Sequence, residues 1–509
     1  MAFAVVVLVS PLTIMPLLDD ESTRALVSME MVISKNYWVP TTNGELYQNK
    51  PPLFNWMVAG LMNVIPNYSE FWLRLPSLGI LLAMTVCTFY FVKKEIGSKV
   101  AFFTAFAYLT CGRMLFYDTM LGYIDPFFSF VVFLNFYLLY RLDSAKQPWS
   151  YFLASYLLCL LAYMFKGLPA LVFQFISLPV ALFLKKDLKR LFSLPHVAGG
   201  VLFLAGLATY YYIYSTYFPV EDLFATLWEQ SSKRTAIEHG LGDSILYIVG
   251  FPFEFTMHFL PWTLLVVFCF RRDIVKIVRG NAFITYSCLI FMANIWVYWV
   301  SPETRPRYLF MFLPFYFAIL FYVYENFASE LGKTIVHYIV FGLSILLVLI
   351  AFVPLFYPGL DFISFLIPKA ALVVVALVGI SYLCWFNKEH AVGLLFLALL
   401  VARLGFNFFI LPDREREAPE SEYKRIGRKI AEVSKGSPVY LLDESFMDHD
   451  ISFYLTQAKH QIISKKHDKV EKGIYYICFP YLASKYGLRP VYKFRMSWEN
   501  TEAYVAILP

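Results

Sequence analysis

The sequence predicts an α-helical polytopic membrane protein with about thirteen transmembrane helices, followed by a small C-terminal α/β soluble domain. Of the 509 residues, 59% are hydrophobic and only 16% are charged, whereas roughly 25% are charged in a typical soluble protein. Apolar runs recur between residues 2 and 411, and many approach the length of about 20 residues that a transmembrane helix needs. Residues 412–509 contain no such run.

We expect residues 1–411 to form the transmembrane domain. The first apolar run, "MAFAVVVLVSPLTIMPLL", lacks a small-residue cleavage site, which favours a span over a signal peptide. The spans are expected near residues 2–18, 71–92, 99–116, 126–140, 151–164, 168–184, 196–217, 246–270, 281–300, 307–323, 334–357, 362–386 and 391–411.

The charges in the loops predict the orientation. Alternate short connections carry Lys93, Lys94, Lys99, Arg141, Lys146, Lys185, Lys186, Lys189, Arg190, Arg271, Arg272, Lys276, Arg279, Lys333 and Lys388. By the positive-inside rule, that side is cytoplasmic. The outer side then receives residues 19–70, residues 218–245, the turns near Asp125, Lys166 and Arg305, and the whole tail. The net charge of +6 is spread along the chain and does not indicate nucleic-acid binding.

The tail, residues 412–509, has the composition of a soluble domain. "EYKRIGRKIAEVSKGSP" predicts an amphipathic helix that ends at a glycine and a proline. "PVYLLDES", "GIYYICFP" and "AYVAILP" predict short buried strands. The tail has no glycine-rich phosphate loop, so we expect an accessory role. We interpret "DESFMDHD" at 443–450 as a solvated acidic loop rather than a cation site.

The first outer loop, within residues 19–70, opens with "DDESTRALVSMEM". Three carboxylates that directly follow an apolar segment indicate a polar site at this point of the chain. "TRALVSMEMVIS" carries Leu26, Val27, Met31 and Ile33, and we expect it to lie flat on the membrane as an interfacial helix. Two prolines follow Lys50 directly and restrict the backbone there, which fixes the direction of its ammonium group.

Other outer turns carry further polar residues. Asp125 begins a span in "YIDPFF", Lys166 interrupts an apolar run in "YMFKGLPAL", and "SPETRPRYLF" brings Arg305, Arg307 and Tyr308 together. A charge at mid-bilayer costs about 2.5–3.5 kcal/mol on insertion scales, and the cost falls toward the ends of a span. Any one of these residues could be an interfacial anchor, but their coincidence on one face predicts a pocket.

Carboxylates and cations in a membrane-embedded outer pocket suit sugar transfer from a polyprenyl-phosphate lipid. The acceptor hydroxyl needs a general base, which a carboxylate supplies. The leaving group is a phosphate, whose developing charge Lys or Arg stabilises. The isoprenoid tail would lie in the aromatic-rich membrane domain.

The stretch "DDESTRALVSMEM…YWVPTTNGELYQNKPPLFNW" resembles the start of the protein-O-mannosyltransferase-like membrane glycosyltransferases. The branch it is most similar to includes the aminoarabinose transferases that modify lipid A. The resemblance extends through the turns at Asp125, Lys166 and Tyr308. It implies the GT-C fold, a polyprenyl-phosphate sugar donor, a lipid, glycan or protein acceptor, and a place in the cell inner membrane with the active site and C-terminal domain on the periplasmic side.

The family pattern implies specific roles. It has an Asp-Glu pair, then Glu-Met, then Tyr-x-x-Lys-Pro, and counting back from Glu30-Met31 places the pair at Asp20-Glu21 rather than Asp19-Asp20. The implied catalytic residues are Asp20 as the base, with Glu21 and Asp125 orienting it or holding a divalent metal with it. The implied substrate-binding residues are Tyr47, Asn49, Lys50, Lys166, Arg305, Arg307 and Tyr308.

Two departures from the aminoarabinose-transferase pattern stand out. Ser22-Thr23-Arg24 replaces Thr-Arg-Tyr, so the arginine is displaced or replaced. Asn49 replaces the glutamate of Glu-Lys-Pro, which would face an amino sugar. The resemblance therefore does not imply an aminoarabinose donor, whereas the fold and the reaction class stay as implied.

Several alternatives stay open. Asp20 could be only a helix cap. The protein could be a transporter, a lipid-linked oligosaccharide flippase or an oligosaccharide ligase with an outward vestibule. Transporters usually carry internal repeats and midplane charges, and neither pattern is evident in this sequence. The sequence does not identify the donor sugar or the acceptor.

Overall fold

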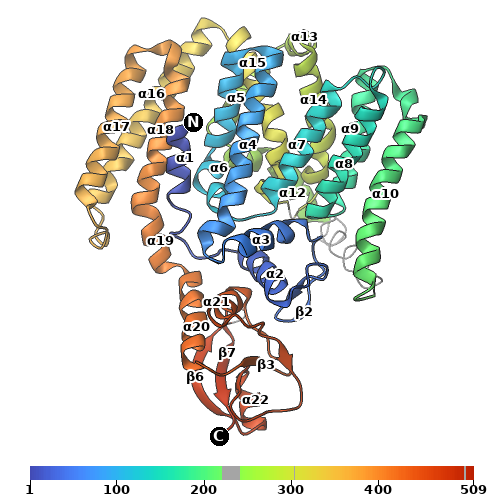
Figure 1. Ribbon diagram of the computed structural model, residues 1–509. Coiled ribbons are helices and arrows are strands. Elements are labelled where there is room, and N and C mark those ends of the chain that lie inside the picture. Colours follow the sequence, from blue (N-terminus) through green and yellow to red (C-terminus); the bar gives the residue numbers. More distant parts are fainter. Residues whose placement is uncertain (220–240, 303, 498–499) are drawn as a thin grey trace.

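The computed structural model describes residues 1–219, 241–302, 304–497 and 500–509. A helical bundle forms one part of the molecule, and a small domain with a β-sheet lies at one end of it (Figure 1). Most of the predicted outer segment 218–245 lies outside the described residues. The chain starts inside the bundle with α1 and ends in the sheet domain.

The bundle consists mostly of long apolar helices that pack through aromatic and aliphatic side chains. Its elements are α1 (Ala2–Val9), α4 (Glu70–Ile96), α5 (Ser98–Thr110), α6 (Gly112–Phe116), η1 (Asp118–Met120), α7 (Asp125–Arg141), α8 (Pro148–Lys166), α9 (Pro169–Leu184), η2 (Leu188–Phe192), α10 (Leu194–Ser215), α12 (Leu241–His258), η3 (Trp262–Cys269), α13 (Ile274–Arg279), α14 (Ala282–Trp299), η4 (Pro306–Phe312), α15 (Leu313–Phe327), α16 (Glu330–Phe352), η5 (Val353–Leu355), α17 (Leu366–Phe386), η6 (Lys388–His390), α18 (Ala391–Gly405), the π-helical turn η7 (Phe406–Ile410) and α19 (Leu411–Glu417).

In the described part of the chain, eight helices are long and apolar enough to cross a membrane. The number rises to nine if the pair 98–110 and 112–120, bent by 49°, is one span. Shorter helices such as α7 and α9 occupy other predicted spans. The figure of about thirteen spans therefore stays a prediction, while the membrane-spanning character of the bundle agrees with the sequence.

The prediction of one continuous span over residues 2–18 is wrong. The helix α1 ends at Val9, and residues 10–18 continue as turns and irregular chain. Pro11 and Pro16 cannot donate a backbone hydrogen bond, and each restricts the residue before it. The helix therefore cannot extend through this segment, and its carbonyl groups need partners from elsewhere in the protein.

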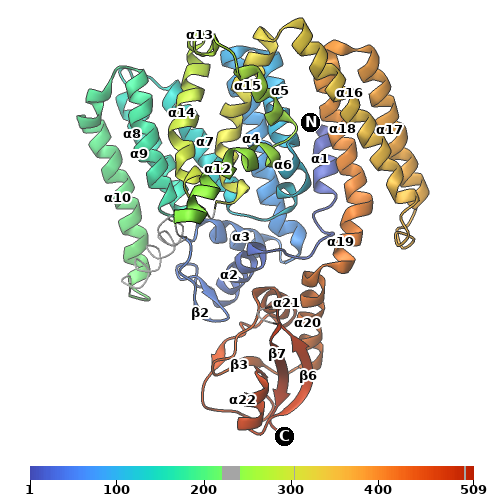
Figure 2. The same cartoon turned by 180° about the vertical axis from the view of Figure 1, so that it is seen from behind.

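The first outer segment forms a compact layer between the bundle and the sheet domain (Figures 1 and 2). It consists of α2 (Asp20–Ser34), the hairpin β1 (Thr41–Thr42) and β2 (Glu45–Leu46), and α3 (Leu53–Val64). Leu26, Val27 and Met31 on α2 are at most 1% exposed. The expectation that this apolar face lies against the membrane is wrong, because α3 and neighbouring protein cover it.

Glu30 fixes the hairpin to α2. Its carboxylate is fully buried and accepts hydrogen bonds from the Thr41 hydroxyl at 2.7 Å and from the backbone N–H groups of Asn43 at 2.6 Å and Gly44 at 3.2 Å. Burial raises the pKa of Glu30, and the three hydrogen bonds oppose that shift. The Glu-Met signature therefore holds the chain that leads into Tyr47 and Lys50.

The C-terminal domain contains α20 (Pro419–Val433), β3 (Val439–Leu442), α21 (His449–Lys459), β4 (Lys465–Lys466), β5 (Tyr475–Cys478), α22 (Pro480–Lys485), β6 (Arg489–Arg495) and β7 (Glu502–Ile507). The sheet order is β4-β3-β5-β7-β6, with β3 parallel to β4 and β5 and the remaining pairs antiparallel. The predicted helix and three strands are confirmed. The sequence analysis missed β4, β6, α21 and α22.

The interpretation of residues 443–450 as a solvated acidic loop is wrong at two positions. Asp443 is 7% exposed and accepts hydrogen bonds from the Asp468 N–H at 3.0 Å and from the Tyr486 hydroxyl at 2.7 Å. Asp450 stands in the first turn of α21, where that helix packs against α2, beside Ser22. Both carboxylates serve packing of the domain rather than a cation.

The cation-rich loops lie at the end of the bundle opposite the sheet domain. The label α13 marks this end in both views (Figures 1 and 2), and α13 carries Lys276 and Arg279. The first outer segment lies at the other end, beside the sheet domain. The cation-rich loops and the first outer segment, which the sequence assigns to opposite sides of the membrane, therefore lie at opposite ends of the bundle.

We predict that the contact between α21 and α2 weakens as the pH rises. Burial raises the pKa of Asp450 to about 7. A carboxyl group whose folded pKa is raised stabilises the folded protein fully below its unfolded pKa, near 4, and loses that contribution as the pH rises through about 7. Asp450→Asn, which mimics the protonated acid, should raise the melting temperature of the full-length protein clearly at pH 8 and less at pH 5. An equal shift at both pH values would contradict this account.

Candidate active site

A polar cavity of about 140 Å³ opens beside the N-terminal end of α2. Five separate parts of the chain contribute to it: the start of α2, the irregular segment that follows the hairpin, the turn before α7, the end of α8 and the η4 turn. Its lining residues are Asp20, Arg24, Tyr47, Asn49, Lys50, Tyr123, Ile124, Asp125, Lys166 and Tyr308. Seven of the ten residues singled out from the sequence therefore meet at one cavity.

Arg307 joins the carboxylates at the edge of this cavity. Its guanidinium lies 2.8 Å from Asp20, 3.2 Å from Asp19 and 3.0 Å from Asp125. The same group stacks over the ring of Tyr123 at 4.2 Å. Arg307 is 2% exposed and the Asp125 side chain 10% exposed, so water screens this ion pair little, whereas the Asp19 and Asp20 carboxylates stay open to solvent.

Lys166 forms the second cationic centre. Its ammonium lies 2.5 Å from the Asp125 carboxylate and 3.4 Å from the centre of the Tyr308 ring. Asp125 is thus held between Lys166 and Arg307. Its place at the start of α7 also puts its negative charge at the positive end of that helix.

Arg24 is a cavity residue whose role the sequence analysis left open. It follows Asp20 by one helical turn, so its side chain lies on the same face of α2 as the Asp20 carboxylate. Arg24 is 5% exposed, its guanidinium stacks over the Tyr47 ring at 5.1 Å, and its Nη1 has no hydrogen-bond partner. The signal in the sequence was the Ser-Thr-Arg stretch, in which the arginine stands one position later than in the family pattern.

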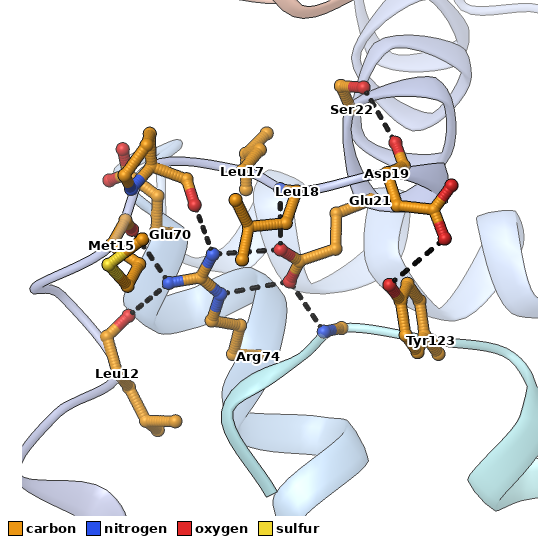
Figure 3. Close-up of polar contacts among 12 residues, drawn as sticks. Leu12, Met15, Leu17, Leu18, Asp19, Glu21, Ser22, Glu70, Arg74 and Tyr123 are labelled. Carbon is orange, nitrogen blue, oxygen red and sulfur yellow. Dashed lines mark hydrogen bonds and ion pairs between the residues drawn. The ribbon is translucent and has the colours of Figure 1, made fainter. Parts of the chain in front are cut away.

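Glu21 does not line the cavity, and Figure 3 shows its carboxylate facing the guanidinium of Arg74. Its fully buried carboxylate pairs with Arg74 through two contacts of 2.9 and 2.8 Å. It also accepts hydrogen bonds from the backbone N–H groups of Gly122 at 2.6 Å and Leu18 at 2.9 Å. Both oxygens of Glu21 are thus engaged in a buried network, so Glu21 can orient Asp20 only through the backbone and not by direct contact.

Arg74 completes this network. Its guanidinium donates to the carbonyl oxygens of Leu12 at 3.0 Å, Met15 at 2.8 Å and Pro16 at 2.6 Å. These carbonyls belong to the irregular segment after α1 (Figure 3). The Glu21–Arg74 pair therefore fixes the chain immediately before the Asp19-Asp20 dipeptide.

Asp19 and Arg305 lie at the rim. The Asp19 carboxylate is 2.7 Å from Arg305 and accepts a long hydrogen bond of 3.4 Å from the Tyr123 hydroxyl. The side chain of Arg305 is 52% exposed, in contrast to that of Arg307. Neither Asp19 nor Arg305 lines the cavity.

The predicted possibility of a divalent metal finds no fitting set of ligands. In the part of the chain that the structure describes, no group of three or more His, Cys, Asp or Glu side chains could hold a metal ion. Asp20 and Asp125 instead flank the Arg307 guanidinium. This guanidinium supplies the positive charge between the two carboxylates.

Comparison with known proteins supports the resemblance found in the sequence. Residues 49–214 match the family model described as dolichyl-phosphate-mannose-protein mannosyltransferase. An uncharacterized protein of Aquifex aeolicus (strain VF5) is 23% identical over 450 residues, which covers 86% of this chain and 82% of that protein. The region that matches the family model contains Asn49, Lys50, Asp125 and Lys166.

Two solved structures share the fold over nearly the whole chain. They are crystal structures of ArnT from Cupriavidus metallidurans, one bound to undecaprenyl phosphate with a TM-score of 0.69 and one in the apo state with a TM-score of 0.70. In both, the identity is 18%, and the match covers 99% of this chain and 96% of that chain. The chain is therefore an α-helical membrane protein of the GT-C fold with a small C-terminal α/β domain.

Removing one partner of the buried Glu21–Arg74 pair should destabilise the protein strongly. Glu21→Gln keeps the size of the side chain but leaves the Arg74 charge uncompensated, and breaking a buried pair in this way costs about 3–5 kcal/mol. We expect a clear fall in the melting temperature of the detergent-solubilised protein. Glu330→Gln, which removes an exposed partner of Lys333, should change it little. Equal melting temperatures for Glu21→Gln and wild type would contradict the structural role.

Proposed function

We propose that the protein is a glycosyltransferase that moves a sugar from a polyprenyl-phosphate donor to an acceptor hydroxyl at the outer face of the inner membrane. The observation that carries this proposal is the cavity itself, where the carboxylate of Asp20 faces a set of cations at one end of a membrane-embedded bundle. The likeness to an ArnT structure bound to undecaprenyl phosphate supports the lipid-linked donor.

Asp20 is the proposed general base. Its side chain is 52% exposed, lines the cavity and is held by Arg307 at 2.8 Å. Asp125 is engaged on both sides by Lys166 and Arg307, so it orients the site rather than accepting a proton. Asp20 therefore combines access to the cavity with a fixed direction, as a base needs.

Lys50 and Arg24 are the proposed ligands of the donor phosphate. Both line the cavity, and the Nη1 atom of Arg24 has no partner. Because breaking the donor bond leaves negative charge on the phosphate, fixed cations at this point stabilise the transition state more than the ground state. The cavity lining carries Arg24, Lys50 and Lys166 against Asp20 and Asp125, an excess of one positive charge that suits a phosphodiester.

The cavity is small. Its volume of about 140 Å³ is below the roughly 300 Å³ at which pockets for drug-sized ligands begin. Next to it, Tyr47 and Lys50 also line a small pocket with Tyr210, Tyr211 and Tyr214. We assign the first isoprenoid units of the donor to this aromatic side.

The proposed reaction is a single displacement. The acceptor hydroxyl gives its proton to Asp20 while its oxygen forms a bond to the anomeric carbon of the donor. The bond between that carbon and the phosphate oxygen breaks, and the polyprenyl phosphate leaves as an anion beside Lys50 and Arg24. One displacement inverts the anomeric configuration.

Replacement of the proposed base should reduce turnover sharply. A general base contributes typically 10²–10⁴-fold, so Asp20→Asn should lose about that much transfer from a polyprenyl-phosphate sugar in the purified protein. Its binding of undecaprenyl phosphate should be unchanged, because Lys50 and Arg24 remain. The matched variant Asp19→Asn should lose far less, since Asp19 does not line the cavity. Wild-type turnover in Asp20→Asn would remove this carboxylate from the mechanism.

The proposed orientation can be read from the accessibility of introduced cysteines. Lys435 lies in the C-terminal domain and Asp187 lies between α9 and α10, in a loop predicted to be cytoplasmic. A cysteine at position 435 should react with a membrane-impermeant thiol reagent in intact spheroplasts, whereas one at position 187 should react only after lysis. The reverse pattern would place the cavity on the cytoplasmic side.

A further inference from the structure

The helix α21 of the C-terminal domain makes hydrogen bonds to the segment that carries Asp20. The Tyr454 hydroxyl accepts a hydrogen bond from the Leu17 N–H at 3.0 Å and donates one to the Glu70 carboxylate at 2.8 Å. Tyr454 is 1% exposed. Lys424 of α20 meets the same Glu70 oxygen at 2.5 Å. One buried hydroxyl therefore links the soluble domain to the chain just before Asp19 and to the start of α4.

The same helix also contacts the chain that follows Asp19 and Asp20. The His449 Nδ1 lies 2.8 Å from the Thr23 hydroxyl, and Thr23 directly precedes Arg24. Gln457 donates to the Tyr68 carbonyl oxygen at 2.7 Å. Between Leu17 and Thr23, both of which α21 holds, stand the two aspartates of the site.

The backbone between these two anchors is strained. Asp19 has φ of 53° and ψ of −126°, a combination that residues with a side chain rarely adopt. Such a conformation persists where the surroundings impose it. Contacts on both sides of Asp19 supply that constraint, from Arg74 and Glu21 within the bundle and from α21 outside it.

We propose that α21 is a positioning element for the transfer reaction, with Tyr454 and His449 as positioning residues that act through Leu17 and Thr23. The inference rests on the proposed function for its kinetic consequence. In this proposal α21 sets the direction of the Asp20 carboxylate although the soluble domain supplies no group to the cavity.

This arrangement predicts a separation of kinetic effects. Tyr454 holds the chain before Asp20, whereas the proposed phosphate ligand Lys50 follows the hairpin and Arg24 lies beyond Asp20 on α2. Misplacing the base slows the chemical step and leaves Lys50 in place. Loss of the Tyr454 contact should therefore lower kcat and leave the KM for the donor nearly unchanged.

The test uses the full-length protein with paired variants. Tyr454→Phe should lower kcat about tenfold with the donor KM within twofold, and Tyr486→Phe is its matched control. Tyr486 also donates to a carboxylate, Asp443, but inside the C-terminal domain, so its variant should match wild type. His449→Ala should lower kcat in the same way, and His449→Gln, which keeps a hydrogen-bonding group for Thr23, should restore at least half of the activity.

Hydrogen exchange supplies a readout that does not depend on the reaction. Backbone amides of residues 17–24 should exchange at least tenfold faster in Tyr454→Phe than in Tyr486→Phe, with α7 unchanged. Unchanged exchange at 17–24, or equal kcat in all variants of an active enzyme, would overturn the positioning role. If wild type transfers no sugar from any polyprenyl-phosphate donor, but residues 17–24 exchange faster in Tyr454→Phe, then the proposed function is wrong. The role of α21 in holding this segment is then still supported.

Discussion

The ion pairs of Arg307 are the interaction on which the arrangement of the site depends. One guanidinium that is 2% exposed meets Asp19 and Asp20 from the first outer segment and Asp125 from the start of α7. Leaving such a charge unpaired would cost several kcal/mol. Three parts of the chain that are far apart in sequence must therefore come together at η4, and the cavity forms where they meet.

A second buried ion pair, Glu21–Arg74, fixes the chain segment that precedes Asp19. Pro11 and Pro16 end the first helix early and leave the carbonyls of residues 12–16 without helical partners. Arg74 takes up three of these carbonyls and is itself balanced by Glu21. The failure of the predicted first span and the removal of Glu21 from the cavity thus have one physical cause. The protein keeps a non-helical segment at the bundle end, and that segment presents Asp20.

The separate ion pairs of Arg307 and Arg74 explain why adjacent carboxylates have different roles. Asp19, Asp20 and Glu21 are consecutive, yet one lies at the rim with Arg305, one faces the cavity, and one is fully buried with Arg74. Successive side chains at the start of a helix point about 100° apart, so only one of the three can face a given cavity. Arg24, four residues after Asp20, returns to that face.

The sequence by itself determined the class of the fold, the two ends of the bundle and most members of the site. Apolar runs, loop charges and short motifs are local properties, and Lys50, Asp125, Lys166 and Tyr308 were visible in them. Only the tertiary structure decided that Arg74 takes Glu21 and that α21 holds Leu17 and Thr23. The reason is distance along the chain: the Leu17–Tyr454 contact joins residues 437 positions apart. No local pattern reports such a contact, because burial and ion pairing are settled by what the folded chain brings alongside.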